Sequence, residues 1–387
     1  MLITRLKLRN WRNFRQVDVA LGPRGYVIGA NASGKSNLLD VFRFLRTVAQ
    51  SEGGGLQKAL KERGGLSKLR SLHARREPDV RIEIEVCELL EDSQPRWRYV
   101  LSFKSEGKGQ QRVLVQEESV DKDGEVLFRR PDRDDKHDPA RLTQTFLEQI
   151  NTNAKFRELV DFLSATTYLH LVPQLLKHSD EISGRIIEND PFGQGLLQRI
   201  ARTPAKTQKA RLSRIQQALE VAVPQFSELH FEQDPITGLP HLKANFKHWR
   251  VNGAWQREDQ FSDGTLRLIG FLWALQEGEG LLLLEEPELS LNDAITEHIP
   301  LMIDRVLRQR KKGGFLRQVL STTHSDTLIG SISEPASILL LEPGENGTTV
   351  RTANEVEMQE MTHGLTPSEV MLPKTRPQNI EQMGLFK

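Results

Sequence analysis

The chain has 387 residues, of which 27% are charged and 37% are hydrophobic, and its formal net charge is +1. This balance is ordinary for a globular protein and excludes both a globally basic nucleic-acid coat and an acidic tail protein. No run reaches the ~18 apolar residues that a membrane helix needs, and the first residues lack a signal peptide's apolar core. The single cysteine, Cys87, rules out an internal disulfide. We therefore expect a cytoplasmic protein of two or three domains without membrane contact.

The apolar pattern predicts the elements in chain order. The N-terminal residues alternate as short strands, and the last of these, residues 26–28, runs into a glycine. Residues 37–50 have the spacing of an amphipathic helix, and residues 80–130 alternate as an antiparallel meander of four or five strands. Residues 142–222 are mostly helical in pattern, and residues 226–256 return to strands. The pattern then predicts, in order, a helix at 264–277, a buried strand at 281–285, a helix at 293–311 and short strands at 318–322 and 337–342.

A glycine-rich loop follows the strand at residues 26–28. It reads Gly29-Ala30-Asn31-Ala32-Ser33-Gly34-Lys35-Ser36 and matches the phosphate-binding pattern G-x-x-x-x-G-K-[ST] at every position. Glycines let the backbone turn tightly so that its N–H groups point at a phosphate, and the following helix adds partial positive charge. Lys35 supplies a charge for the β- and γ-phosphates, and Ser36 supplies a hydroxyl for Mg²⁺. Since a strand precedes the loop and a helix follows it, a chance glycine turn is the weaker interpretation.

An acidic pair ends the most apolar strand of the chain. Four leucines at 281–284 run into Glu285-Glu286-Pro287-Glu288, which is typical of a central parallel strand. Ligands of α/β sheets bind at the carboxyl ends of such strands. One carboxylate there can hold Mg²⁺, and the next can orient or deprotonate the attacking water. A strand that ends in a solvated acidic turn is the alternative.

Two further motifs lie close to this strand in the sequence. Ser262-Asp263-Gly264-Thr265 precedes an apolar helix, so that Ser262 reads as an N-cap and the helix start as a second anion site. An ordinary capped helix is the alternative. A short strand at 319–322 delivers His324 to its carboxyl end, where it could sense a γ-phosphate. A lone histidine is more often structural.

Together and in this order, the four motifs resemble those of the ABC-type ATPases, in the branch of SMC, Rad50, RecF and OLD-like proteins. Within that branch the chain is most similar to the stand-alone bacterial AAA_21 ATPases. The opening Leu8-Arg9-Asn10-Trp11-Arg12-Asn13-Phe14 is similar to the start of that group. The resemblance runs from about residue 1 to residue 350, and residues 51–260 carry it only loosely.

The resemblance implies an α/β fold, namely the P-loop NTPase head of an ABC-type ATPase with an inserted antiparallel β lobe, a helical lobe and no long coiled coil. The insert is expected because the stretch from Lys35 to Glu285 is far longer than one βαβ crossover requires. The implied divisions are an ATPase core at 1–50 and 257–350, a β-rich lobe with a basic loop at 51–141, a helical lobe with returning strands at 142–256, and a C-terminal tail at 351–387.

The resemblance also implies that two protomers form a head-to-tail homodimer that shares two ATP molecules. Ser262 and the Gly264 amide of one protomer would cap the γ-phosphate bound by the other. The residues that would bind the nucleotide in the first protomer are Arg12, Gly29, Asn31, Ala32, Ser33, Gly34, Lys35, Ser36 and Asn37. A shared site would make association depend on ATP.

The catalytic roles come from the same resemblance. Glu286 would be the catalytic carboxylate, and Lys35 and His324 would act on the γ-phosphate. Ser36 and Glu285 would hold Mg²⁺. The implied cofactors are therefore ATP and Mg²⁺.

The sequence departs from the general family pattern at four positions. Glu285 stands where Asp is usual, and its longer side chain could shift Mg²⁺ coordination. Ala32 stands where Gly is common, at a cost of about 1 kcal/mol if the position needs a positive φ. Asp263 replaces a glycine, and Asn292 replaces a His or Asp, which bears on hydrolysis more than on binding. The glutamine that links lobe to nucleotide has only a weak candidate, Gln116.

Three functions remain open. The first is an ATP-hydrolysing switch in DNA repair or anti-phage defence that works with a separately encoded effector. Two basic clusters, Lys58–Arg76 and Arg308–Arg317, could bind nucleic acid, although a solvated face is the commoner reason for such clusters. The second is an ATP-dependent scaffold with very slow hydrolysis. The third, a transporter subunit, is disfavoured by the opening motif, the Ser262 signature and the long insert.

Overall fold

The computed structural model describes residues 1–74, 78–88, 92, 94–107, 112–178, 190, 192–247, 254–308 and 317–375. The chain divides into two compact units, each built from segments far apart in the sequence. Unit 1 comprises Met1–Thr167, Glu279–Leu283 and Leu307–Lys387, and unit 2 comprises Tyr168–Gly278 and Leu284–Val306. No described helix is long and apolar enough to cross a membrane.

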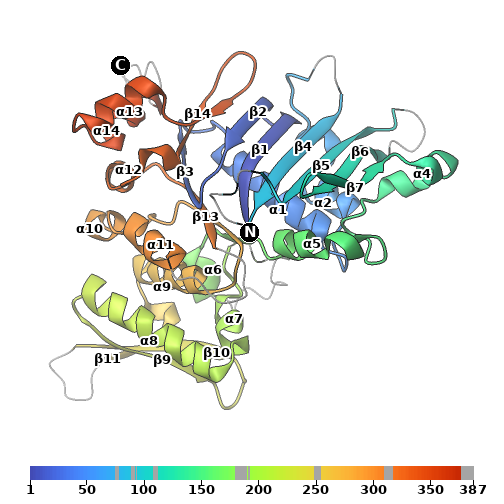
Figure 1. The fold of residues 1–387 in the computed structure, drawn as a ribbon. Coiled ribbons are helices and arrows are strands. Elements are labelled where there is room, and N and C mark those ends of the chain that lie inside the picture. Colours follow the sequence, from blue (N-terminus) through green and yellow to red (C-terminus); the bar gives the residue numbers. More distant parts are fainter. Residues whose placement is uncertain are drawn as a thin grey trace, which may run out of the picture. The chain divides into compact units, whose positions relative to one another are not determined.

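Unit 1 contains a six-stranded antiparallel sheet of order β2-β1-β4-β5-β6-β7 (Figure 1). Its strands are β1 (Leu2–Trp11), β2 (Phe14–Ala20), β4 (Val80–Cys87), β5 (Trp97–Ser105), β6 (Val113–Lys122) and β7 (Glu125–Arg130). Alternation of apolar side chains turns one face of these strands to the core. Phe44 of α1 (Lys35–Ala49) stacks there on Phe103, with ring centroids 5.5 Å apart. Strands β4 to β7 are the meander that the alternation predicts.

The second six-stranded sheet has the order β15-β14-β3-β13-β12-β8, and the boundary between the units crosses β12 and β8. Its strands are β3 (Arg24–Gly29), β8 (Thr167–Leu169), β12 (Leu281–Glu285), β13 (Gln318–Thr322), β14 (Ile338–Glu342) and β15 (Thr349–Arg351). Both β13 and β14 run parallel to β3. The carboxyl ends of these three strands therefore share one edge, where α/β proteins bind their ligands.

The other helices of unit 1 are α2 (Leu56–Glu62), α3 (Leu66–Leu69), α4 (Arg133–His137), α5 (Arg157–Ser164), α12 (Asp326–Gly330), α13 (Glu355–Thr362) and α14 (Pro367–Met371). Two of them lie in the segment interpreted as a tail. Arg351 fixes this segment, because its guanidinium contacts Glu342 of β14 at 2.9 Å and Glu357 of α13 at 2.8 Å. Residues 376–387 lie outside the described residues.

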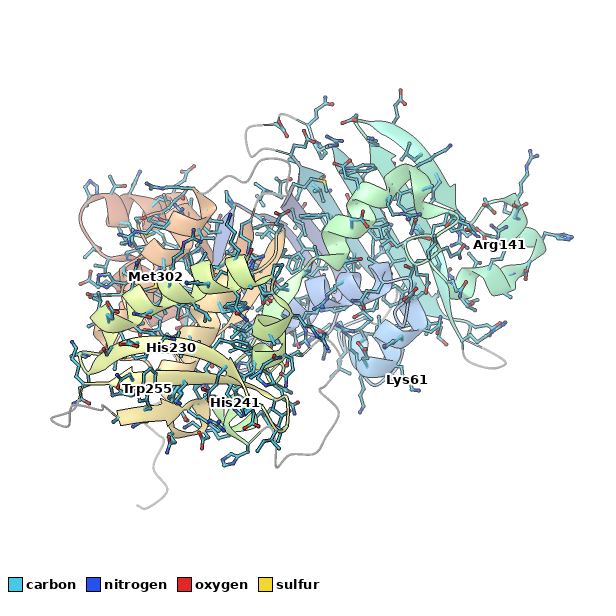
Figure 2. The ribbon with its side chains drawn as sticks, turned by 90° about the horizontal axis from the view of Figure 1, so that it is seen from below. Lys61, Arg141, His230, His241, Trp255 and Met302 are labelled. Carbon is cyan, nitrogen blue, oxygen red and sulfur yellow. The ribbon has the colours of Figure 1, made fainter. Side chains whose placement is uncertain are left out.

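Unit 2 contains a three-stranded antiparallel sheet of order β11-β10-β9, with α8 packed along it (Figure 1). Its strands are β9 (Phe226–Gln233), β10 (Pro240–Phe246) and β11 (Ala254–Arg257), and its helices are α6 (Pro173–Lys177), α7 (Leu196–Arg202), α8 (Ala205–Ala222), α9 (Asp263–Gln276), α10 (Asp293–Thr296) and α11 (Ile299–Leu307). Figure 2 shows His230 of β9 and Trp255 of β11, whose ring centroids are 5.3 Å apart. The longest described helix, α8, has 18 residues, so the described chain contains no long coiled coil.

Candidate nucleotide site

The glycine-rich loop joins β3 to α1 in unit 1, as its sequence predicts. Gly34 has φ 101°, and a Cβ at this position would lie 2.1 Å from Nδ2 of Asn13. A Cβ at Gly29 would lie 2.9 Å from the carbonyl oxygen of Leu341. Both glycines are therefore required, one by its backbone conformation and both by the close approach of neighbouring atoms. Ala32 has φ 63°, so this alanine does occupy the left-handed region that the motif suggested.

Lys35 begins α1 and is 7% exposed. Its ammonium donates to the carbonyl oxygens of Gly29 and Ala30, each at 3.1 Å, and so lies over the loop. The first turn of α1 holds no acidic residue and no side-chain cap. Its backbone N–H groups and this ammonium therefore present positive charge to the same place, which suits an anion.

Asn13, between β1 and β2, holds the loop in shape. Its amide nitrogen donates to the Ser33 carbonyl at 2.7 Å and to the Thr348 hydroxyl at 2.8 Å. Its oxygen accepts from the side chain of Asn37 at 2.8 Å. The sequence placed Asn13 within the opening motif but gave no reason to expect this contact. It links the start of the chain, the loop and the segment before β15.

Arg12 lies next to Asn13 with φ 49° and pairs with Asp40 of α1 at 2.7 Å. Arg63 also contacts Asp40, at 2.8 Å. Burial alone would raise the pKa of Asp40, but the neighbouring guanidinium groups of Arg63 and Arg12 hold it below its ordinary value. Asp40 was not among the predicted site residues, although it follows Lys35 by little more than one helical turn.

A cavity of about 580 Å³ lies beside this ion-pair cluster in unit 1. Its lining is mainly basic and comprises Arg12, Asp40, Arg43, Lys61, Glu62, Arg63, Gly64 and Lys68. Lys61 stands at the surface of the unit (Figure 2). The described part of the predicted cluster Lys58–Arg76 thus contributes to a cavity next to α1. Arg75 and Arg76 of this cluster, and residues 309–316 of the cluster Arg308–Arg317, lie outside the described residues.

His324 follows β13 and is exposed. The backbone N–H of Thr323 donates to the carbonyl oxygen of Val27 at 3.2 Å, which places this strand end beside the strand that leads into the loop. In unit 1 the structure therefore brings His324 and the glycine-rich loop to the same edge of the parallel sheet. Ser325 caps α12 by accepting from the N–H of Leu328 at 3.2 Å.

The remaining predicted site residues belong to unit 2. Ser262 is the N-cap of α9, and its hydroxyl accepts from the N–H of Thr265 at 3.1 Å. A Cβ at Gly264 would lie 2.5 Å from the carbonyl oxygen of Ser290, which itself has φ 63°. The start of α9 and the segment after the acidic strand are therefore packed backbone against backbone. Asn292 caps α10 by accepting from the N–H of Ile295 at 2.9 Å.

Asp263, at the first position of α9, binds two side chains of α6. The ammonium of Lys177 lies 2.7 Å from one carboxylate oxygen, and Gln174 donates to the other at 2.6 Å. The hydrogen bond from Lys177 lowers the pKa of Asp263 below its ordinary value. Lys177 and Gln174 were not predicted, because nothing in their local sequence pairs them with a residue so far along the chain.

Glu285 ends β12, Glu286 follows it directly, and both are partly buried. The hydroxyl of Tyr168, from β8, donates to the carboxylate of Glu285, and a ring nitrogen of His170 lies 3.4 Å from its carbonyl oxygen. Glu286 has φ 45°, a conformation that L residues rarely adopt. Gln116, the weak candidate for the linking glutamine, lies in β6 of unit 1.

The chain matches a family model, AAA_21, described as "AAA domain, putative AbiEii toxin, Type IV TA system", over residues 26–330. Among curated proteins, it is 46% identical over 59 residues to the DNA replication and repair protein RecF of Brucella abortus, covering 15% of this chain and 14% of that protein. The RecF of Clavibacter michiganensis is 32% identical over 89 residues, or 22% of each chain. The chain therefore spans only a minor part of these relatives' length.

Solved structures of SMC heads share the fold. The Smc head bound to the C-winged helix domain of ScpA has a TM-score of 0.54 at 15% identity, covering 92% of this chain and 100% of that one. The Smc head from Pyrococcus furiosus, with an extended coiled coil and bound to the C-terminal domain of ScpA, has a TM-score of 0.51 at 14% identity, covering 94% and 98%.

Proposed function

The chain belongs to the AAA_21 family of ABC-type ATPases, in the branch of the SMC and RecF proteins, and from this premise we propose that it is an ATP-binding and ATP-hydrolysing switch. The observation that carries the proposal is the loop before α1. There a buried lysine, a left-handed glycine and an uncapped helix N-terminus free of acidic residues converge. This arrangement suits the β- and γ-phosphates of a nucleotide.

The proposed assembly is a homodimer closed head to tail on two ATP molecules. The loop residues, with Asn37 and Arg12, bind the nucleotide in one protomer, and Ser262 with the Gly264 amide meets its γ-phosphate from the other. Two features of unit 2 support this role for α9: Ser262 is exposed at its start, and Lys177 neutralises the carboxylate of Asp263 beside it. Each ATP would then join two surfaces, so that binding favours the closed state.

Mg²⁺ fits the oxygen donors proposed for it. Ser36 offers an exposed hydroxyl in the first turn of α1, and Glu285 offers a carboxylate fixed by Tyr168. Mg²⁺ in such sites takes one or two protein ligands beside phosphate oxygens and waters. When bound, it neutralises charge on the phosphates. Within the loop, the buried Ser33 hydroxyl has no hydrogen-bond partner among the described residues, as expected where a ligand completes the loop.

The proposed chemistry uses three side chains. Glu286 orients the attacking water and accepts its proton, because it directly follows Glu285, the proposed metal ligand, at the strand end. Lys35 stabilises negative charge that develops on the γ-phosphate, and His324 contacts the same group from the neighbouring strand end. The left-handed backbone of Glu286 aims its side chain differently from an extended residue, which supports a special role at this position.

We place the switch in DNA repair or anti-phage defence in the cytoplasm, working with a separately encoded effector. Support comes from the RecF relatives, whose name states replication and repair, and from the family description as a putative toxin system. The basic clusters Lys58–Arg76 and Arg308–Arg317 are the proposed nucleic-acid contacts, and the cavity next to α1 gives the first of them a concave, mainly basic surface.

A scaffold with very slow hydrolysis is the second candidate. The observations that favour it are three departures from the family pattern, at Ala32 with its strained backbone, at Glu285 and at Asn292. These departures would slow hydrolysis more than they would prevent nucleotide binding. The two candidates share the dimer and differ in turnover.

ATP turnover by the wild type and by Glu286→Gln separates the candidates. A switch should turn over ATP at least about 100-fold faster than Glu286→Gln, since general acid–base catalysis contributes roughly 10²–10⁴-fold. Both proteins should bind ATP equally well, and Lys35→Ala should bind it poorly. Glu297→Gln, an exposed carboxylate on the same segment, is the matched control and should keep wild-type turnover. Wild-type turnover no higher than that of Glu286→Gln would reject the switch and leave the scaffold.

A further inference from the structure

Tyr168 makes a contact that the nucleotide-binding motifs do not account for. It lies in β8, and its hydroxyl donates to the carboxylate of Glu285 at the end of β12. The neighbouring His170 reaches the carbonyl oxygen of the same glutamate at 3.4 Å. The side chain of Glu285 is thus contacted from β8, and its backbone from the residue that directly follows β8. All three residues belong to unit 2.

Glu285 needs such a partner because of its length. It stands where the wider superfamily usually carries Asp, and it has one more methylene and one more rotatable bond. A glutamate side chain therefore loses more rotamer freedom than an aspartate side chain when it is fixed. A metal ligand must be held in one orientation, so this freedom would weaken coordination unless another group restricts it.

Tyr168 is well suited to restrict it. A phenol has few rotatable bonds, and its hydroxyl forms a short, strong hydrogen bond with an ionised carboxylate. A carboxylate has about four acceptor positions, so one bond from a tyrosine is compatible with coordination of a cation by the same group. Because Tyr168 lies within β8, the extended backbone of the strand also fixes the position from which its side chain extends.

We propose that Tyr168 is a positioning residue that orients Glu285 for Mg²⁺ and so allows a glutamate to replace the usual aspartate. This inference rests on the proposed function, because that function assigns the metal to Glu285. The inference predicts that the effect of Tyr168→Phe on metal binding depends on the length of the side chain at position 285. With the shorter Glu285→Asp side chain, the carboxylate lies nearer the backbone and no longer needs the tyrosine.

The test measures metal binding rather than turnover. Full-length Glu286→Gln, saturated with ATP, is titrated with Mn²⁺, and the protein-bound ion is followed by electron paramagnetic resonance. Tyr168→Phe in this background should weaken Mn²⁺ binding roughly 10-fold, the effect usual for residues that orient metal ligands. In the Glu285→Asp background the same substitution should change binding by less than about 2-fold, a non-additivity typical of groups in contact.

Tyr99→Phe is the matched control. It removes a tyrosine hydroxyl that donates to a buried carboxylate, Glu118, at 3.2 Å in unit 1. It should leave Mn²⁺ affinity unchanged. ATP binding and thermal midpoint are measured for every variant, so that a misfolded protein is recognised.

Three results would overturn the inference. Unchanged Mn²⁺ affinity in Tyr168→Phe, with ATP binding intact, rejects the role of Tyr168 and leaves the proposed function standing. An equal loss in the Glu285 and Asp backgrounds assigns Tyr168 a merely structural role. Absence of ATP-dependent Mn²⁺ binding in the parent Glu286→Gln protein rejects both the inference and the proposed function.

Discussion

At the scale of single residues, the motifs share an unusual backbone. Arg12, Ala32, Glu286 and Ser290 all have φ between 45° and 63°, although none is a glycine. This region costs an L residue roughly 1–2 kcal/mol, so a folded chain keeps it only where surrounding contacts impose it. Each of the four lies in or beside a motif that the sequence singled out. Asp123 and Asp190 have a similar φ outside the motifs, so this strain accompanies the chemistry but does not by itself identify it.

Ala32→Gly should stabilise the protein by about 1 kcal/mol, because glycine adopts this φ without strain. Ala32 is exposed, so the lost methyl removes little packing. The free energy of unfolding from denaturant titration measures the effect. Ala30→Gly, two residues earlier and without a positive φ, is the control and should lower stability. A loss of stability in Ala32→Gly as large as in Ala30→Gly would contradict the strain at this position.

Sequence alone could predict the backbone conformation of Ala32, because glycine is common at this position of the motif. It could not predict that Asn13 fills the space beside Gly34, or that Tyr168 contacts Glu285. Those contacts join residues far apart in the chain. Local pattern carries no information about them, since it depends only on neighbours within a few turns or strand residues.

At the scale of elements, the strongest predictions were the meander, the strand–loop–helix unit and the buried strand before Glu285. All three have a regular apolar period, and the structure confirms them as β4–β7, β3–α1 and β12. The structure of the segment from residue 351 was harder to predict, because its proline and polar residues are typical of a loosely held tail. Its described part forms α13 and α14, fixed by ion pairs from Arg351 that reach back to β14.

The ion pair between Arg351 and Glu357 of α13 should make the stability of the fold depend on pH. Hydrogen bonds from Arg351 hold the pKa of Glu357 at about 2, against an ordinary 4.5, although its burial acts the other way, and Lys374 and the Asn354 N–H add to the effect. The lowered pKa means that Glu357 stabilises the fold above pH 4.5 and loses this contribution as the pH falls towards 2. The full contribution is about 3 kcal/mol.

Unfolding free energies of the wild type and Glu357→Gln should therefore differ most near neutral pH and converge in acid. Denaturant titrations at several pH values between about 7 and about 3 measure this difference. Glu360→Gln, an exposed glutamate on the same helix, should show a small difference at every pH. A Glu357→Gln difference that stays constant or grows as the pH falls would contradict the ion-pair account.

At the scale of the whole molecule, the predicted site residues fall into two groups. Unit 1 holds Arg12, the glycine-rich loop, Asn37 and His324, and unit 2 holds Ser262, Gly264, Glu285 and Glu286. The family could be inferred from the order of these motifs, two of which, the glycine-rich loop and His324, follow neighbouring parallel strands. The partner, the effector and the nucleic acid could not be inferred from the sequence, since surfaces that recognise other molecules have no sequence pattern comparable to these motifs.

The central claim is an ATP-dependent dimer, and light scattering of Glu286→Gln tests it most directly. We predict a monomer without nucleotide, a dimer with ATP and Mg²⁺, and a monomer again when Ser262→Arg is added. Ser213→Arg, at another exposed serine, on α8, is the control and should leave the dimer intact. A molar mass that is the same with and without ATP, or a dimer that still forms when Ser262→Arg is added, would contradict a nucleotide shared between two protomers.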